Sequence, residues 1–305
     1  MKYLITGASG FIGTHIVKAV GGHNVVGLGR TYVANLSSFI EREIRPGQDF
    51  TDCLQGVDCV IHCAAMVHQR NKSFEDYYRV NSLGTIELAE QAASMRVPRF
   101  IFLSSVKVNG DESFGEERFS AHDAPQPTDD YGKSKAIAEE ALLKIGRTTG
   151  LDVVIVRPPL VYGPGVKANF AWLMRAVELG CPMPFGRLNS NRRSMVFVDN
   201  LVDLIVKCSV HKRAAGEVFM VSDDRSLSTR RLTELLMKAY RRPVICWPFP
   251  EALLVLGLTL LGRRDVAHRL TRSLEVDISK TEELLGWYPP YTVKQAIEKT
   301  VGYRS

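Results

Sequence analysis

The sequence has 305 residues, of which 45% are hydrophobic and 24% are charged, a composition typical of soluble globular proteins with one large domain and a smaller one. Its net charge of +6 is spread along the chain with no block of five or more lysines and arginines, which argues against a nucleic-acid partner. The six cysteines form no Cys-x-x-Cys pair and have no histidine at zinc spacing, so we expect free thiols in a reducing cytoplasm and no metal site.

The first thirteen residues join a buried strand to a glycine-rich turn. Residues 2–6 are β-branched and aromatic, Gly7, Gly10 and Gly13 follow, and residues 14–20 have helical spacing. In this order the turn lets the backbone approach a pyrophosphate, and the helix N-terminus directs free N–H groups at it. Glycine turns also join elements that bind nothing, but this position at the start of a strand–helix alternation favours a dinucleotide site.

The next elements predict the fold. We expect strands at residues 24–29, 59–63, 99–104 and 152–157, and helices at 77–93 and 131–144. Apolar strands that alternate with helices indicate an α/β, Rossmann-type, doubly wound parallel sheet. The polar residues 110–130 have no clear period, and we interpret them as a flap beside the site.

The composition changes beyond Pro158, where prolines and glycines become frequent. We expect a helix at 170–180, strands at 194–198 and 218–221 that return to the main sheet, and later helices capped by Ser228, by Ser279 with Glu282, and by Thr292 with Gln295. The chain is therefore divided into a dinucleotide-binding domain at 1–164, with a returning segment at about 193–222, and a smaller C-terminal α/β substrate lobe at 165–192 and 223–305.

The longest apolar run, residues 252–261, is too short to span a bilayer. Arg263 and Arg264 follow it, so a helix lying on a membrane surface is one interpretation. A helix packed into the core is favoured, because apolar helices with a basic end are common in soluble folds.

Ser105, Tyr131 and Lys135 form the candidate catalytic group. Tyr131 and Lys135 are four residues apart and share one face of a predicted helix, where the ammonium could lower the tyrosine pKa from about 10 toward neutrality. A serine hydroxyl from a neighbouring strand end could hold a substrate oxygen. A surface Tyr–Lys pair is the alternative, which the preceding glycine turn makes less favoured.

Motifs spread from residue 4 to residue 287 resemble one family: TGASGFIG, HCAA, SSVKVNG, YGKSK, RPPLVYGPG and DISKTEELLGW. They are similar to extended short-chain dehydrogenases/reductases, in particular to nucleotide-sugar 4-epimerases and 4-keto reductases of surface-polysaccharide synthesis. The resemblance implies a UDP-sugar substrate, NAD or NADP as cofactor, and a cytoplasmic homodimer.

The resemblance also implies roles for individual residues. Tyr131 would exchange a proton at the sugar C4 oxygen, Lys135 would hold the nicotinamide ribose, and Ser105 would orient the substrate. The cofactor-binding residues would further include Gly7, Gly10, Phe11, Ile12, Gly13, Arg30, Asp49, Phe50, Ala64 and Ala65. The substrate would also meet Lys107, Asn169, Arg193 and a C-terminal arginine, Arg269 or Arg272.

Several of these residues have structural alternatives. Asp49 could cap a turn, Asn169 could cap the helix at Phe170, and Arg193 could be a solvated surface charge. Two further polar residues are interpreted as structural: His62 as a core histidine and Asn81 as a buried support.

Three departures from the family pattern refine the prediction. The second strand ends in Gly29 and Arg30 without an acid, which is compatible with NADP. Val106 and Lys107 stand where dehydratases have an Asp-Glu pair, so a dehydratase is rejected. Leu160 stands where relatives often have asparagine, so the substrate phosphate must be held differently.

The function expected is NAD(P)-dependent reduction of a 4-keto UDP-N-acetyl-6-deoxyhexosamine. The alternative is a UDP-glucose or UDP-N-acetylglucosamine 4-epimerase with tightly bound NAD, with a lipid-linked sugar as a further substrate class. A non-catalytic nucleotide sensor is less favoured, because Tyr131 and Lys135 are both present.

Overall fold

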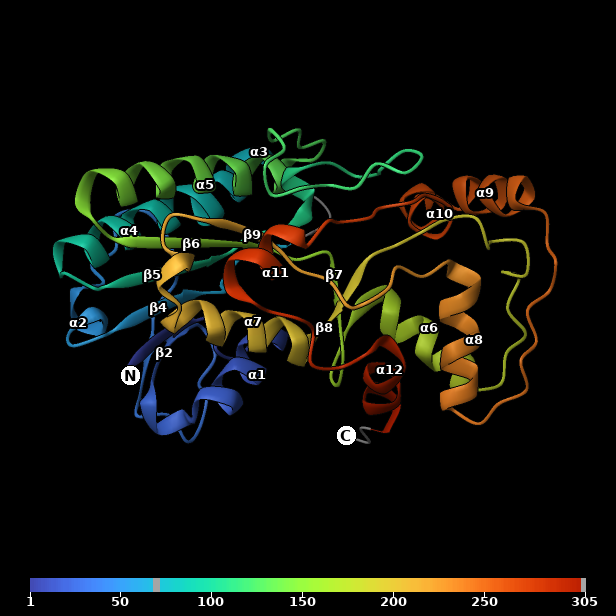
Figure 1. Ribbon diagram of the computed structural model, residues 1–305, viewed down its shortest axis with the longest axis horizontal. Helices are drawn as coiled ribbons and strands as arrows, with labels where there is room; N and C mark the ends of the chain where they lie inside the picture. The colour runs from blue at the N-terminus through green and yellow to red at the C-terminus, as the bar shows by residue number, and fades with distance from the viewer. Residues whose placement is uncertain (68–71, 303–305) are drawn as a thin grey trace.

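The computed structural model describes residues 1–67 and 72–302. A seven-stranded parallel sheet forms its centre, in the order β3-β2-β1-β4-β5-β6-β9 (Figure 1). The strands are β1 (Tyr3–Thr6), β2 (Val25–Gly29), β3 (Ser38–Glu41), β4 (Cys59–His62), β5 (Arg99–Leu103), β6 (Asp152–Arg157) and β9 (Val218–Met220). Every residue of β1, β4 and β5 is buried, which explains why these strands are mostly apolar, with polar residues only at their ends. The predicted doubly wound sheet is confirmed.

Helices cover both faces of the sheet (Figure 1). On one face α1 (Phe11–Val20) and α7 (Val198–Val210) share a core with β1, β4 and β5. On the other face α2 (Thr51–Leu54), α4 (Gly84–Ser94) and α5 (Asp130–Thr149) bury apolar side chains against the same strands. A short helix, α3 (Phe74–Tyr77), continues through a π-helical turn (Tyr78–Leu83) into α4.

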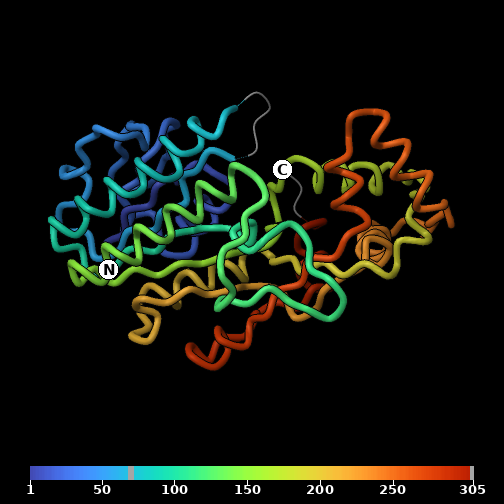
Figure 2. The backbone as a smooth tube through the Cα atoms, turned by 90° about the horizontal axis from the view of Figure 1, so that it is seen from above, coloured from blue at the N-terminus to red at the C-terminus, as the bar shows by residue number. Residues whose placement is uncertain are grey.

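Most of the segments beyond β6 build the other end of the molecule (Figures 1 and 2). They comprise β7 (Leu160–Tyr162), β8 (Met195–Phe197), α6 (Ala168–Glu178), α8 (Thr229–Ala239), α9 (Glu251–Leu260), α10 (Arg264–Thr271) and α12 (Val293–Gly302). α11 (Ser279–Leu285) instead packs beside β9, where the Thr281 hydroxyl donates to the Met220 carbonyl at 2.6 Å (Figure 1). The prediction that residues 194–198 return to the main sheet is wrong. β8 pairs with β7 in a separate two-stranded sheet, and of the two short strands only β9 joins the main sheet, beside β6.

Two of the three predicted helix caps are confirmed. The Ser228 hydroxyl accepts from the Arg231 N–H at 3.1 Å, and Thr292 and Gln295 form reciprocal bonds at the start of α12. The cap at Ser279 is wrong, because α11 has Ile278 as its N-cap. The backbone and hydroxyl of Ser279 instead donate to the Asp277 carboxylate at 2.9 and 2.5 Å.

The core position predicted for residues 252–261 is also wrong. They form α9, in which no residue is fully buried, and the exposed fractions of Leu256 and Leu260 are 54% and 79%. Within the described ranges, no helix combines the length and the apolar character needed to cross a membrane.

Candidate active site

The glycine-rich turn lies between β1 and α1 and is closely packed. Gly7 has φ +68°, and a Cβ there would lie 3.0 Å from the Ala64 nitrogen. A Cβ on Gly13 would lie 2.2 Å from the Gly7 carbonyl oxygen, so only glycine lets α1 approach the strand. These contacts bring the N-terminus of α1 to the edge where β1 and β4 end.

The same turn leaves backbone donors available for an anion. Gly10, the N-cap of α1, provides no side-chain cap. The N–H groups of Phe11 and Ile12 are in the first turn and therefore have no intrahelical acceptor. At the end of β5, the buried Ser104 hydroxyl has no hydrogen-bond partner among the described residues. A dinucleotide with its pyrophosphate at the helix N-terminus fits this arrangement.

Ala64 and Ala65 directly follow β4, and Ala64 faces Gly7. The Ala64 N–H donates to the Thr6 hydroxyl at 3.1 Å. His62, at the end of the same strand, contacts the Thr6 and Thr85 hydroxyls at 2.9 and 3.0 Å, and burial lowers its pKa to about 3. The interpretation of His62 as a satisfied core histidine is therefore confirmed.

Asn81 is fully buried in the π-helical turn and has a structural role, as predicted. Its side chain accepts from the Met66 N–H at 2.7 Å and donates to the Met66 carbonyl at 2.9 Å. It also donates to the Ser134 hydroxyl on α5 at 3.1 Å. Asn81 thereby fastens the segment after Ala65 to the helix that carries Tyr131.

The residues at the predicted adenosine end differ in exposure. Arg30 follows β2, is exposed, and lies 3.9 Å from the Glu43 carboxylate. Asp49 accepts from the N–H and hydroxyl of Thr51 at 2.9 and 2.7 Å, which lowers its pKa and matches the turn-cap alternative. The Phe50 ring lies in the core, so its side chain does not face a cofactor. Glu43 was missed because β3, which precedes it, was not predicted.

α5 places Tyr131 beside Ser105. The Asp129 carboxylate caps the helix by accepting from the Gly132 N–H at 2.7 Å, which puts Tyr131 in the first turn. The Tyr131 hydroxyl is hydrogen-bonded to the Ser105 side chain, and the Tyr77 ring packs edge-on against Tyr131 with ring centroids 6.4 Å apart. Because the two hydroxyl groups are in contact, both can reach the same substrate oxygen, as proton exchange at that oxygen requires.

Lys135 lies one turn further along α5 and is almost completely buried. Its ammonium donates to the Leu103 carbonyl at 2.9 Å and lies 4.3 Å from the centre of the Phe102 ring. Burial lowers its pKa to about 8, against the opposing effects of Cys63 and Glu139. Lys135 therefore lies between α5 and the end of β5, one helical turn from Tyr131.

In the protein without cofactor, the expectation that Lys135 lowers the pKa of Tyr131 is wrong. Burial and the Asp129 carboxylate raise the pKa of Tyr131, and only the hydrogen bond from Ser105 acts in the opposite direction. The Lys135 ammonium bonds to Leu103 instead. The phenol is therefore held protonated by its protein surroundings.

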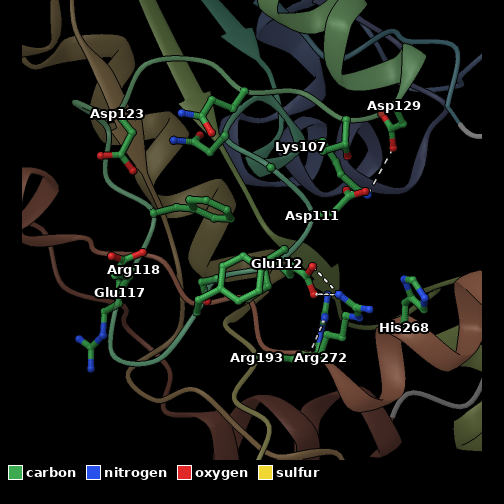
Figure 3. Close-up of a pocket in the computed structure, with 18 of the residues that line it drawn as sticks. Lys107, Asp111, Glu112, Glu117, Arg118, Asp123, Asp129, Arg193, His268 and Arg272 are labelled. Carbon is green, nitrogen blue, oxygen red and sulfur yellow. Dashed lines mark hydrogen bonds and ion pairs between the residues drawn. The ribbon is translucent and has the colours of Figure 1, made fainter. Parts of the chain in front are cut away.

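A cavity of about 1100 Å³ lies between the flap and α10 (Figure 3). Residues 110–114 and 117–119 of the predicted flap line one wall, and backbone bonds from Ser113 to Ser273 and from Phe119 to Glu275 hold that wall in place. Predicted substrate residues Lys107, Arg193 and Arg269 line the cavity, as does Arg272. The cavity adjoins the catalytic group, since Lys107 and Asp129 belong to its lining and lie two residues from Ser105 and Tyr131.

Besides Arg118 on the flap, the lysine and arginine side chains that line the cavity form two groups (Figure 3). The Lys107 ammonium pairs with Asp111 and lies 3.3 Å from the Asp129 carboxylate. Arg193 donates to the Arg272 carbonyl at 3.1 Å, and Arg272 forms an ion pair with Glu112 on the flap (Figure 3). Burial and the neighbouring Arg269 lower the pKa of Arg193 to about 10. Three neighbouring guanidinium groups suit a dianionic diphosphate.

Asn169 is not brought into this group. It is an exposed residue in the first turn of α6 and is not part of the cavity lining. Its alternative role as the cap of the helix is wrong, because the N-cap of α6 is Lys167. His268, which also lines the cavity, was missed because α10 was not predicted.

Comparisons with known proteins identify the family of the chain. Residues 3–222 match the model of the NAD dependent epimerase/dehydratase family. The chain is 42% identical to a UDP-glucose 4-epimerase of Vibrio cholerae, over 97% of this chain and 93% of that protein. The chain therefore belongs to the NAD-dependent epimerase/dehydratase family of extended short-chain dehydrogenases/reductases.

More distant relatives share the fold over nearly the whole chain. An N-acetyl-alpha-D-glucosaminyl-diphospho-ditrans,octacis-undecaprenol 4-epimerase of Escherichia coli O157:H7 is 27% identical, over 98% of this chain and 94% of that protein. The structure of UDP-glucose 4-epimerase from Thermotoga maritima with UDP-glucose superimposes with a TM-score of 0.80 at 24% identity, covering 99% of this chain and 98% of that one.

Proposed function

We propose that this protein is a UDP-hexose 4-epimerase of surface-polysaccharide synthesis, acting on UDP-glucose or UDP-N-acetylglucosamine. The observation that carries the proposal is the 42% identity to a UDP-glucose 4-epimerase over nearly the full length, together with the Tyr131–Ser105 pair beside a cavity rich in arginine. NAD is the cofactor proposed, since the exposed Arg30 that was compatible with NADP lies near the Glu43 carboxylate.

In this proposal Tyr131 accepts the proton of the C4 hydroxyl and later returns it to the C4 oxygen. A nicotinamide held beside the glycine turn of Gly7, Gly10 and Gly13 would supply reversible hydride exchange at C4, which inverts C4 when the hydride comes back on the opposite face of the sugar. Ser105, bonded to Tyr131, holds the C4 oxygen during both transfers. Lys135, whose ammonium donates to the Leu103 carbonyl at the end of β5, would hold the nicotinamide ribose, and the positive charge of an oxidised nicotinamide would favour the tyrosinate.

The diphosphate of the substrate would be bound by Arg193, Arg269 and Arg272. Arg193 donates to the Arg272 carbonyl and has Arg269 as a charged neighbour, whereas Lys107 is two residues from Ser105 and would face the sugar. Dehydration stays excluded from the proposal, because Val106 is a buried apolar residue and Lys107 is a cation where that reaction uses two acids.

A 4-keto reductase would use the same side chains and differs in its net redox change. The test is to incubate the purified protein with UDP-glucose and UDP-N-acetylglucosamine without added cofactor. Conversion to the galacto epimers supports the epimerase. Turnover that requires a 4-keto sugar and consumes one NADH or NADPH for each sugar reduced would show that the protein is a reductase instead.

A lipid-linked sugar diphosphate is a second candidate substrate, favoured by the exposed apolar helix α9 next to α10. The same assay with a polyprenyl-diphosphate sugar in detergent separates the two substrate classes. We further propose a cytoplasmic homodimer, as the family resemblance implies, which light scattering after size exclusion would test.

A further inference from the structure

One end of the molecule carries a continuous exposed apolar segment, residues 244–261, which we call the apolar arm. It contains Val244, Ile245, Trp247, Phe249, Leu253, Leu256, Leu260 and Leu261, with exposed fractions from 38% for Phe249 to 79% for Leu260. Figures 1 and 2 place α9, the helix of the arm, at the tip farthest from the sheet. Contiguous apolar surface of this kind marks an interaction site.

The arm is not a misplaced piece of the core. The neighbouring helix α8 buries Thr229, Thr233, Leu236 and Met237, whereas no residue of α9 is fully buried. Within α9, Leu254 packs against the main core, whereas Leu253, Leu256 and Leu260 are exposed. Because apolar residues occur all round α9, its contacts with the core and with α10 leave these leucines in water.

The charges around the arm are predominantly positive. Arg241 and Arg242 precede it, Arg263 and Arg264 follow it, and all four are exposed. The acidic residues of this stretch are Glu251 and Asp265. Neither Arg263 nor Arg264 forms an ion pair with any residue in the ranges 1–67 and 72–302. Arg242 donates to the Glu178 carbonyl at 2.9 Å and Arg264 to the His268 ring at 3.4 Å, so neither contact neutralises the positive charge. Exposed arginines on both sides of an apolar surface are complementary to anionic headgroups.

We propose that the apolar arm binds the surface of a bilayer that contains anionic phospholipids. α9 is far too short to span a bilayer, and a short apolar helix with basic ends lies in the interfacial plane. Trp247 and Phe249 are exposed aromatic residues of the type that occupies the headgroup level. The proposal rests on this surface and does not depend on which sugar the protein uses.

Docking would also position the cavity. α10 starts at Arg264, directly after the arm, and its residues Asp265, His268 and Arg269 line the cavity. Only α10 therefore separates a bilayer bound to α9 from the proposed diphosphate site.

The experiment measures sedimentation of the full-length protein with vesicles of phosphatidylcholine alone and of phosphatidylcholine with phosphatidylglycerol. We expect binding to the anionic vesicles. We expect binding to weaken by at least about tenfold in each of two double variants, Leu256→Asp/Leu260→Asp and Arg263→Glu/Arg264→Glu. Val210→Asp, at an equally exposed apolar position on the distant helix α7, should bind like the wild type.

Thermal melting and cofactor content establish that the variants are folded. Failure of the wild-type protein to sediment with anionic vesicles would overturn the proposal. So would binding that neither double variant weakens, because the contact would then lie elsewhere. Self-association in lipid-free buffer that Leu256→Asp/Leu260→Asp abolishes, without vesicle binding, would show that a second copy covers the arm instead.

Discussion

The Tyr131 hydroxyl is subject to opposing influences from the residues around it. Burial and the Asp129 carboxylate raise its pKa, while the hydrogen bond with the Ser105 side chain lowers it. Asp129 is needed for the structure even though it raises this pKa, because it caps the helix that carries Tyr131. The Tyr131 phenol therefore stays protonated in the protein alone. A nearby positive charge, such as that of an oxidised nicotinamide, would lower its pKa and allow it to lose the proton.

The first prediction concerns this proton. Tyr131→Phe keeps the ring and removes the hydroxyl, so kcat should fall by about 10²- to 10⁴-fold, the usual contribution of general acid–base catalysis. Bound cofactor should remain, because the glycine turn is a separate part of the site. Steady-state epimerisation and the absorbance of released nicotinamide check both expectations, and turnover within a few-fold of wild type would contradict the proposed role.

Lys135 leads to a prediction about stability and pH. Its pKa is lowered from 10.5 in the unfolded chain to about 8 in the folded protein, so the fold bears the cost of a buried cation below pH 8. As the pH rises from about 8 to 10.5, the unfolded chain binds more protons than the folded one, and the cost disappears. A shift of this size corresponds to about 3 kcal/mol.

We therefore expect the free energy of unfolding of the cofactor-free protein to rise, relative to Lys135→Met, across this pH window. Urea unfolding of both proteins at neutral and at high pH measures the difference. Lys133→Met removes an exposed lysine two residues away and should show no such dependence. A wild-type to Lys135→Met difference that does not change with pH would contradict the burial of a charged lysine.

At the scale of elements, one buried ion pair joins α5 to the sheet. Arg157 on β6 contacts Glu139 on α5 at 2.5 Å and donates to the Asn109 side chain at 3.1 Å, and both charged side chains are almost fully buried. Asn109 follows the turn that contains Ser105. This network therefore fixes the helix of Tyr131 and the segment of Ser105 relative to the same strand.

Glu139→Gln should consequently destabilise the protein by about 3 kcal/mol, because it leaves a buried guanidinium without its counter-charge. Chemical denaturation measures this loss, and kcat should fall as Ser105 and Tyr131 lose their common support. Glu140→Gln, at the exposed neighbouring position, is the control and should change neither quantity. Equal stability of the two variants would show that the pair contributes little.

The flap competes with substrate for one of the arginines. Glu112 pairs with Arg272, which we propose as a diphosphate ligand. Glu112→Ala should release Arg272 and lower KM for the UDP-sugar by several-fold, with little change in kcat. Glu116→Ala removes an exposed flap carboxylate outside the cavity and should leave KM unchanged. A raised KM for Glu112→Ala would mean that the ion pair orients Arg272 for the substrate.

At the scale of the whole molecule, the central sheet and the Tyr131–Ser105 contact followed from sequence, because buried parallel strands and glycine turns have strong local patterns. Edge strand β3 was missed, since its four residues are only half-buried or exposed. α7 was missed because it follows β8 without a break, Phe197 ending the strand and Val198 starting the helix. The exposure of α9 could not be read from apolar residues, which look the same in a core and on an interaction surface.

The position of the first strand has a consequence for synthesis on the ribosome. β1 is made first yet lies inside the sheet, between β2 and β4, so it acquires its second neighbour only once residue 62 has emerged. β6 pairs along Ile155–Arg157 with β9, which begins at residue 218. A nascent chain that has not reached this point carries an open, apolar strand edge, the kind of surface that chaperones shield until translation supplies the missing strand.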